Sequence, residues 1–197
     1  RQLENNQRSL TELPALQKLD SGALEQVEPA LAHRFNQGLY LPGEGQLDNR
    51  QLLAALVVEM ERLGVRAHWH TPQSPEAFTP GAPGQPDRVL DCRGLGAKGQ
   101  WSALRGVRGE VARIHAPDVT LQRPTRLVHP RYPIYLAPKQ DHVFVIGATE
   151  IESDDLSPAS VRSTLELLSA AYAVHPGFAE ARILEIRTQC RPTLPDN

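Results

Sequence analysis

Three glycines at the spacing of a nucleotide-binding loop are the first residues in this sequence that could do chemistry. Residues 94–99 spell G-x-G-x-x-G directly after the short apolar segment 88–92. In a dinucleotide-binding fold this motif turns from a strand into a helix whose N-terminal N–H groups face a pyrophosphate. Here only residues 100–104 remain before Gly106 interrupts the following helix, and no βαβ crossover with an acidic strand end follows. A tight glycine turn near a ligand is therefore favoured over the full fingerprint.

The other polar residues give little support for metal-binding or acid–base chemistry. His68 and His70 could place two imidazoles on one face of a strand, but no third ligand stands at a useful spacing. The acidic residues between 150 and 155 favour a solvated loop before a helix N-terminus over a cation site. No nucleophile elbow, P-loop or carboxylate pair on regular structure indicates a hydrolase. We expect no metal, and we expect Cys92 and Cys190 to be small buried residues.

The first half of the chain, which must position these residues, is expected to form helices with short strands between them. Residues 1–35 read as two short helices broken at prolines. Asp48 caps a further helix, with Gln51 as its capping-box partner, and Gly64 supplies the stop. The apolar stripe of that helix consists of Leu52, Leu53, Leu56, Val57, Met60 and Leu63, and strands are expected at 65–69 and 88–92.

The second half is expected to form a mostly antiparallel sheet with one helix. Segments 107–116 and 119–128 alternate enough to suggest antiparallel strands. Segments 134–137 and 143–148 look like paired strands, because apolar, β-branched runs flank a polar turn. A helix is expected to start at Ser157, and a last strand covers 182–188. One face of this helix, which ends near His175, carries Val161, Leu165, Leu168 and Tyr172.

Composition indicates an ordinary globular protein. Of the 197 residues, 40% are hydrophobic and 22% are charged, and the net charge is −2. This balance gives no electrostatic footprint for nucleic acid or for an anionic membrane, and no apolar run approaches the ~20 residues that span a bilayer. Two cysteines without metal or disulfide spacing favour the cytoplasm. Both ends look cut, because no initiator Met and no closing element are present, so we expect a fragment.

Seven segments carry, in order, six motifs of one enzyme family, with the paired strands counted as one motif. Residues 45–53 are similar to the segment before that family's second-domain helix, and residues 70–72 to the edge of its cofactor site. Residues 88–97 look like the strand and turn that return to its flavin domain. The remaining matches are 106–110 with the entry to the substrate sheet, 135–139 and 145–149 with the paired active-site strands, and 190–196 with G-L-R-P-x-T-x-D. Together they resemble the D-amino acid oxidase family, and especially the glycine oxidases of bacterial thiamine biosynthesis.

The resemblance implies a fold and a domain plan. The fold would be α/β, or α+β by strict naming, with a mostly antiparallel substrate-domain sheet, flanking helices and a remnant of a Rossmann-like flavin domain. The plan would be a helical segment 1–35, a partial FAD-binding domain 36–97, a substrate-binding domain 98–188 and a return segment 189–197. The family's own G-x-G-x-x-G would lie in an N-terminal part that this chain lacks. FAD would therefore belong to the intact parent and be absent from this chain alone.

The resemblance also implies roles for particular residues. Arg191 matches the arginine that binds the substrate carboxylate as a two-pronged ion pair, and Tyr135, with Tyr132 as its rival, matches the tyrosine whose hydroxyl assists it. The structural alternatives are a surface ion pair for Arg191 and a core position for Tyr135. Residues expected at the cofactor are Gln73, Arg93, Gly94, Leu95 and Gly96. Departures from the family occur in the pocket at Glu150 and at Lys139, Gln189 and Cys190, and they leave the substrate specificity open.

The implied reaction is an amine oxidation. A hydride would pass from the substrate α-carbon to the flavin, oxygen would reoxidise the flavin to give hydrogen peroxide, and the imine would hydrolyse to a 2-oxo acid and ammonia. The expected partner is a small amino acid or amine, without nucleic acid or membrane, and a homo-oligomer stays open. Two alternatives remain: a broader D-amino acid or secondary-amine oxidase, and a catalytically inactive substrate-domain module.

Overall fold

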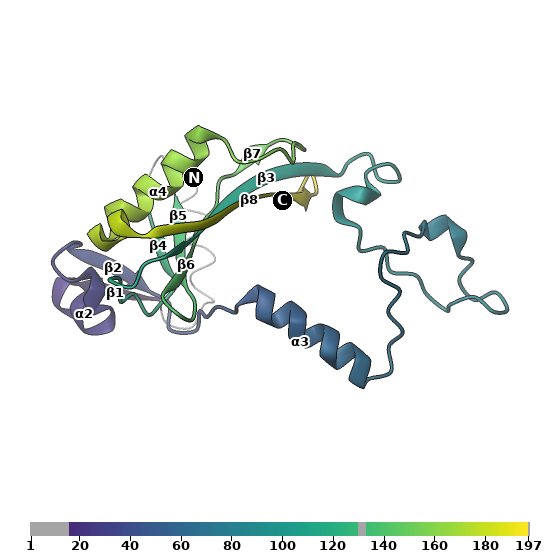
Figure 1. Cartoon of the computed structure of the whole chain (residues 1–197), viewed down its shortest axis with the longest axis horizontal. Coiled ribbons are helices and arrows are strands. Elements are labelled where there is room, and N and C mark those ends of the chain that lie inside the picture. Colours follow the sequence, from purple (N-terminus) through teal and green to yellow (C-terminus); the bar gives the residue numbers. More distant parts are fainter. Residues whose placement is uncertain (1–15, 130–132, 197) are drawn as a thin grey trace. The chain divides into compact units, whose positions relative to one another are not determined.

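The chain divides into two compact units. The computed structural model describes residues 16–129 and 133–196. Unit 1 comprises residues up to 46 together with 109–150 and 157–188, and unit 2 comprises 47–108, 151–156 and 189 onward. Figure 1 labels the elements of both units. The domain boundaries expected from the sequence stay a prediction.

An antiparallel sheet carries the core of unit 1 (Figure 1). Its strands follow the order β4-β5-β6-β3. The pairing expected between segments 134–137 and 143–148 is confirmed, because β5 and β6 are antiparallel neighbours with Leu136 opposite Ile146. The turn between them contains Asp141 and His142, both with positive φ. The bounds of the strands are β3 Arg105–His115, β4 Thr125–Leu127, β5 Ile134–Pro138 and β6 Val143–Gly147.

Side chains alternate between the two faces of this sheet. One face is buried, and the other, which we call the open face, carries half-buried or exposed side chains such as Val111, Arg113, Tyr135 and Val145. Ala112, Leu136 and Ile146 are fully buried and belong to one apolar core. Helix α4 (Val161–Val174) contacts β5 and β6 and supplies Leu167 to the same core. Because successive side chains of a strand point to opposite sides, the neighbours of the buried residues lie on the open face.

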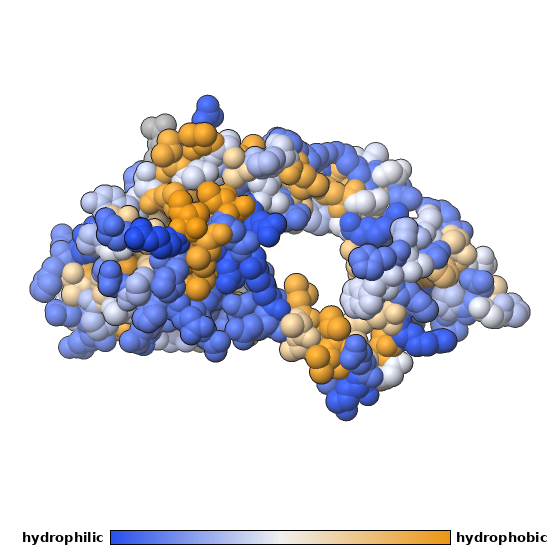
Figure 2. All heavy atoms as spheres, in the orientation of Figure 1, coloured by the Kyte–Doolittle hydropathy of each residue, from blue (hydrophilic) through white to orange (hydrophobic). Residues whose placement is uncertain are grey.

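Helix α4 exposes Val161, Leu165 and Tyr172 of its expected apolar stripe, whereas Leu168 packs partly against the core. It begins at Val161, capped by the Ser160 hydroxyl, so the expected start at Ser157 is wrong. Val161 and Leu165 are 77% and 60% exposed, and Figure 2 shows apolar side chains gathered on the surface over this helix. The buried side chains are Ser163, Leu167, Ala170, Ala171 and Val174. Both stripes fit a helical period, so periodicity alone could not choose between them.

The start of the described chain contains strands where only helices were expected. β1 (Gln17–Asp20) pairs antiparallel with β2 (Gln37–Tyr40), so the expectation of helix throughout 1–35 is wrong at β1; residues 1–15 lie outside the described part. Helix α2 (Ser21–Val27) is present and is capped by Asp20, and the short helix η1 (Pro29–Leu31) follows. The partner of β1 lies some twenty residues further along, which a local pattern does not reveal.

In unit 2 the expected helix is confirmed and the two expected strands are absent. Helix α3 (Asn49–Arg62) starts where the Asp48 carboxylate accepts the N–H groups of Arg50 and Gln51, and the chain turns at Gly64 with a φ of 73°. Segments 65–69 and 88–92 form no strand, since no strand of the described residues lies beside them to accept their hydrogen bonds. The short helices here are η2 (Pro75–Ala77) and η3 (Gly94–Ala97).

Two strands extend the sheet beyond what the pattern indicated. β7 (Ile151–Glu152) pairs with Val107 and Arg108 at the start of β3. β8 (Arg182–Thr193) pairs with β3 and is longer than the expected 182–188. Both β3 and β8 contribute residues to the two units. No described helix combines the length and the apolar character that crossing a membrane requires.

His175 couples the stability of unit 1 to pH. Its Nδ1 accepts the Gly177 N–H at 3.0 Å and so caps the short helix η4 (Pro176–Glu180). Burial, assisted by the positive charge of Arg34, lowers the pKa of His175 below its ordinary 6.5. A protonated Nδ1 cannot accept this hydrogen bond. The unfolded chain therefore binds the proton more readily, and stability is complete above about pH 6.5 and declines as the pH falls further.

We expect the free energy of unfolding to fall by about 1 kcal/mol between pH 7.5 and pH 5.5, roughly the contribution of one hydrogen bond. In His175→Asn this decrease should disappear, because an amide oxygen can accept the same N–H without titrating. Denaturant unfolding followed by circular dichroism at several pH values measures it. His70→Asn, at an exposed position, is the control and should keep the decrease. An unchanged pH dependence in His175→Asn would contradict the assignment.

Candidate functional site

Tyr135 lies on the open face of the sheet in unit 1. It is 37% exposed, although its strand neighbours Ile134 and Leu136 are buried in the core. It pairs with Gly147 on β6. Arg113 and Glu185, from β3 and β8, form an ion pair at 3.4 Å in which both side chains are largely shielded from solvent. This face therefore presents the Tyr135 phenol and a shielded ion pair.

The other residues expected in the substrate pocket are less defined. Glu150 is exposed and follows Thr149, whose hydroxyl accepts the backbone N–H of Glu110 at 2.9 Å. Tyr132 lies outside the described residues. The assignment of Glu150 and Tyr132 to a pocket stays a prediction.

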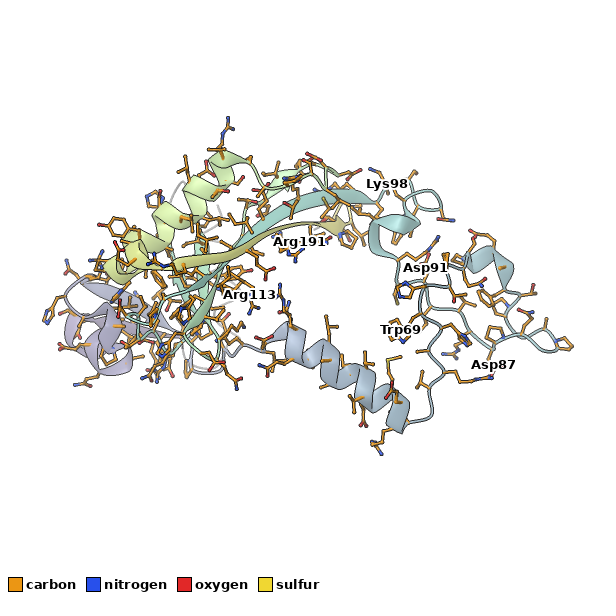
Figure 3. The ribbon with its side chains drawn as sticks, in the orientation of Figure 1. Trp69, Asp87, Asp91, Lys98, Arg113 and Arg191 are labelled. Atoms are coloured by element: carbon orange, nitrogen blue, oxygen red, sulfur yellow. The ribbon has the colours of Figure 1, made fainter. Side chains whose placement is uncertain are left out.

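Arg191 lies near the end of β8, in unit 2 (Figure 3). Its side chain is exposed. The preceding residue, Cys190, is half-buried, and its Sγ lies 3.4 Å from the carbonyl oxygen of Ser153. Tyr135 belongs to unit 1 and Arg191 to unit 2, so their convergence on one carboxylate stays a prediction.

The glycine motif forms a tight turn. Residues 94–97 make the short helix η3, and turn residues follow at 98–100. Gly94 has a φ of 59°. The Arg93 guanidinium donates to both carboxylate oxygens of Asp91, and this bonding, with a further hydrogen bond from the Arg93 backbone N–H, lowers the pKa of Asp91 to about 2. Figure 3 labels Asp91. Arg93 also donates to the Gln100 side chain. Cys92, expected to be buried, is exposed, because segment 88–92 joins no sheet. Gln73, also expected near the cofactor, is exposed.

These residues do not fit the pyrophosphate of a dinucleotide. The fingerprint requires glycine backbone open to the ligand and a helix N-terminus behind it. A Cβ on Gly96 would lie 3.1 Å from the Arg93 side chain, and one on Gly94, which is half-buried, would lie 3.8 Å from Pro192. The helix that follows is a single short turn. The contacts expected of residues 93–96 with another part of a cofactor stay a prediction.

We therefore expect the 197-residue chain to retain no FAD through gel filtration after mixing with excess cofactor. The measurement is the flavin absorption band that elutes with the chain. Free riboflavin, which lacks the pyrophosphate, is the control ligand, and we expect that it too does not elute with the chain. Stoichiometric FAD in the protein peak would show that some other part of the chain holds the pyrophosphate.

The acidic residues of the loop 151–155 are mostly exposed to solvent, as expected, and they also form ion pairs. Asp154 pairs with Lys98 and accepts the Gly106 N–H at 2.7 Å, and the Lys98 hydrogen bond lowers the pKa of Asp154. Glu152 pairs with Arg105. Across residues 16–129 and 133–196, no three His, Cys, Asp or Glu side chains gather as metal ligands. The loop fastens the start of β3 within unit 2.

Two features of the open face were missed in the sequence. The ion pair between Arg113 and Glu185 joins strands separated by about seventy residues, and no local pattern signals it. Gly147, by contrast, could have been found: the turn at 139–142 fixes the register of the hairpin, and counting outward from it places Gly147 opposite Tyr135.

Comparisons with known proteins agree on one family. The family described as FAD dependent oxidoreductase matches residues 1–197. A Rhizobium etli protein that is named a thiamine biosynthesis oxidoreductase, ThiO, is 45% identical over 183 residues, which are 91% of this chain and 53% of that protein. The glycine oxidase of Geobacillus kaustophilus is 27% identical and is covered over 51% of its length. The chain thus spans about half the length of these two relatives.

Solved structures give the same result. The crystal structure of the Geobacillus kaustophilus glycine oxidase superposes with a TM-score of 0.74 over 96% of this chain and 54% of that one, at 25% identity. The L-proline dehydrogenase of P. horikoshii superposes with a TM-score of 0.75 at 12% identity, which shows a shared fold alone. The expected mixed fold with an antiparallel sheet is confirmed. The chain belongs to the family of FAD-dependent oxidoreductases.

Proposed function

We propose that this chain is the substrate-binding part of an FAD-dependent oxidase that converts glycine, or another small amino acid, to a 2-oxo acid, ammonia and hydrogen peroxide. The step would serve the formation of the thiamine thiazole in the cytoplasm. The observation that carries the proposal is the 45% identity, over nearly the whole chain, to a protein named for thiamine biosynthesis. We call the longer protein that would contain this chain, at the length of its relatives, the complete oxidase.

The chain's own residues would bind and orient the substrate. The Arg191 guanidinium presents a planar fork of N–H donors that suits a carboxylate at two points. The Tyr135 hydroxyl would donate a further hydrogen bond to the same carboxylate. Such two-point binding fixes the direction of the α-carbon, and orientation of this kind is a protein's main contribution to a reaction whose electronic chemistry a cofactor supplies. The pyrophosphate of FAD would be held by residues other than the glycine turn 94–97.

A broader D-amino acid or secondary-amine oxidase is the second candidate. It is favoured by Glu150, an exposed acidic residue where the glycine oxidases carry an apolar one, and by Lys139 in place of an arginine. Lys139 donates to the Gln46 side chain at 2.6 Å, so its ammonium group is engaged within unit 1. A substrate-domain module without activity is the third candidate.

Peroxide release from the complete oxidase tests these candidates. We expect flavin-dependent release with glycine, at a kcat/KM above those for sarcosine and D-alanine. A clearly higher value for either of the other two amines would favour the broader oxidase. Flavin-loaded protein that releases no peroxide with any of them would contradict the enzymatic proposal and favour the inactive module.

A further inference from the structure

Gly147 leaves room for the side chain of Tyr135. The two residues lie opposite each other on β6 and β5. A Cβ placed on Gly147 would lie 2.5 Å from the Tyr135 Oη and 2.6 Å from its Cζ. Both distances are shorter than any normal carbon contact, since non-bonded carbon atoms prefer separations of about 3.5–4.0 Å. The end of the phenol therefore occupies the space that a side chain at Gly147 would need.

A third strand borders the same space. Ala112 pairs with Ile146, so the next pair along places Val111 of β3 beside Gly147. The hypothetical Cβ would lie 2.9 Å from the Val111 Cγ1. Tyr135, Gly147 and Val111 thus form one row across β5, β6 and β3, and the phenol extends along this row over the middle strand.

A positive φ is not the reason for a glycine at this position. The described glycines with a positive φ are Gly64, Gly81, Gly84 and Gly94, and Gly147 is not among them. Gly147 is the last residue of β6, and a side chain there would need the space that the phenol occupies.

We propose that Gly147 is a positioning residue for Tyr135: by lacking a side chain it lets the phenol lie across β6 and sets where the hydroxyl stands on the open face. A methyl group at position 147 would force the ring away from the sheet and move the hydroxyl. The inference rests on the proposed function, in which the Tyr135 hydroxyl donates a hydrogen bond to the substrate carboxylate.

A double-mutant cycle in the 197-residue chain tests the contact without any activity. We expect Gly147→Ala to raise the unfolding equilibrium constant roughly tenfold, as overpacking does. In the Tyr135→Leu background the same change should raise it less than about threefold, because the ring is gone and only the close contact with the Val111 Cγ1 remains. Gly43→Ala is the matched control, since a Cβ there meets nothing within 4 Å. Equal effects in both backgrounds would overturn the inference.

The second measurement separates this inference from the proposed function. In the complete oxidase we expect Gly147→Ala to raise KM for glycine at least about fivefold with kcat little changed, and to add nothing in the Tyr135→Leu background. If Tyr135→Leu raises KM and Gly147→Ala does not, the positioning role is wrong. If the stability coupling is present but neither substitution changes KM, the contact stands and the role of Tyr135 in the proposed function fails.

Discussion

Arg191→Ala is expected to lower kcat/KM for glycine by roughly 30- to several-thousand-fold in the complete oxidase. The loss of one partner of a charged hydrogen-bonded pair in a desolvated site costs about 2–5 kcal/mol, and about 1.4 kcal/mol corresponds to one decade. Arg191→Lys keeps the charge but loses the planar fork, so it should both weaken binding and misplace the α-carbon. Peroxide release with glycine measures both variants.

Two controls accompany this prediction. The flavin content should be unchanged in both variants, because Arg191 is assigned to the substrate and not to the cofactor. Arg62→Ala should keep normal efficiency, since Arg62 is an exposed arginine that pairs with Glu59 on its own helix. If Arg191→Ala keeps near-normal efficiency, Arg191 is a structural ion-pair partner and the site assignment is wrong.

Leu167→Ala is expected to destabilise the chain by about 3 kcal/mol, whereas Leu165→Ala should change its stability by less than about 0.5 kcal/mol. Both leucines belong to α4, but Leu167 is 1% exposed and Leu165 is 60% exposed. Leu167 packs in the core of unit 1, so its removal leaves a cavity. The intrinsic helix preference changes equally in the two variants and cancels from the comparison.

Denaturant unfolding of both variants, followed by circular dichroism, measures this difference. The comparison bears directly on which face of α4 packs on the sheet, because the sequence pattern placed Leu165 in the apolar stripe. Equal losses of stability in the two variants would contradict the packing of α4 described above.

The elements that could be predicted from the sequence are those with local causes. Asp48 and Gly64 bound α3 because a cap and a left-handed turn act within a few residues. The hairpin of β5 and β6 follows from two apolar runs around a short polar turn. The strand β1 could not be predicted in this way, because its partner β2 lies elsewhere in the chain. Segments 65–69 and 88–92 have strand-like residues but no neighbouring strand within the described part of the chain.

The residues of the candidate site also divide into those that the sequence could indicate and those that depend on the folded sheet. Arg191 and Tyr135 were found through motifs, since nothing in their local pattern distinguishes them from an exposed arginine and a strand tyrosine. The glycine motif 94–99 was not expected to be a fingerprint because the helix after it is too short in the sequence, and the structure forms only the short helix η3 there. The ion pair between Arg113 and Glu185 depends on the pairing of β3 with β8, which is a property of the folded sheet.

A crystal structure of the complete oxidase with bound acetate tests the central claim most directly. Acetate presents the carboxylate of glycine without the amine that would react. We predict that both of its oxygens accept hydrogen bonds from the Arg191 guanidinium, with the Tyr135 hydroxyl within hydrogen-bond distance of the same carboxylate. Side-chain tips more than ~12 Å apart, with core between them, would contradict the claim that Arg191 and Tyr135 form one substrate site.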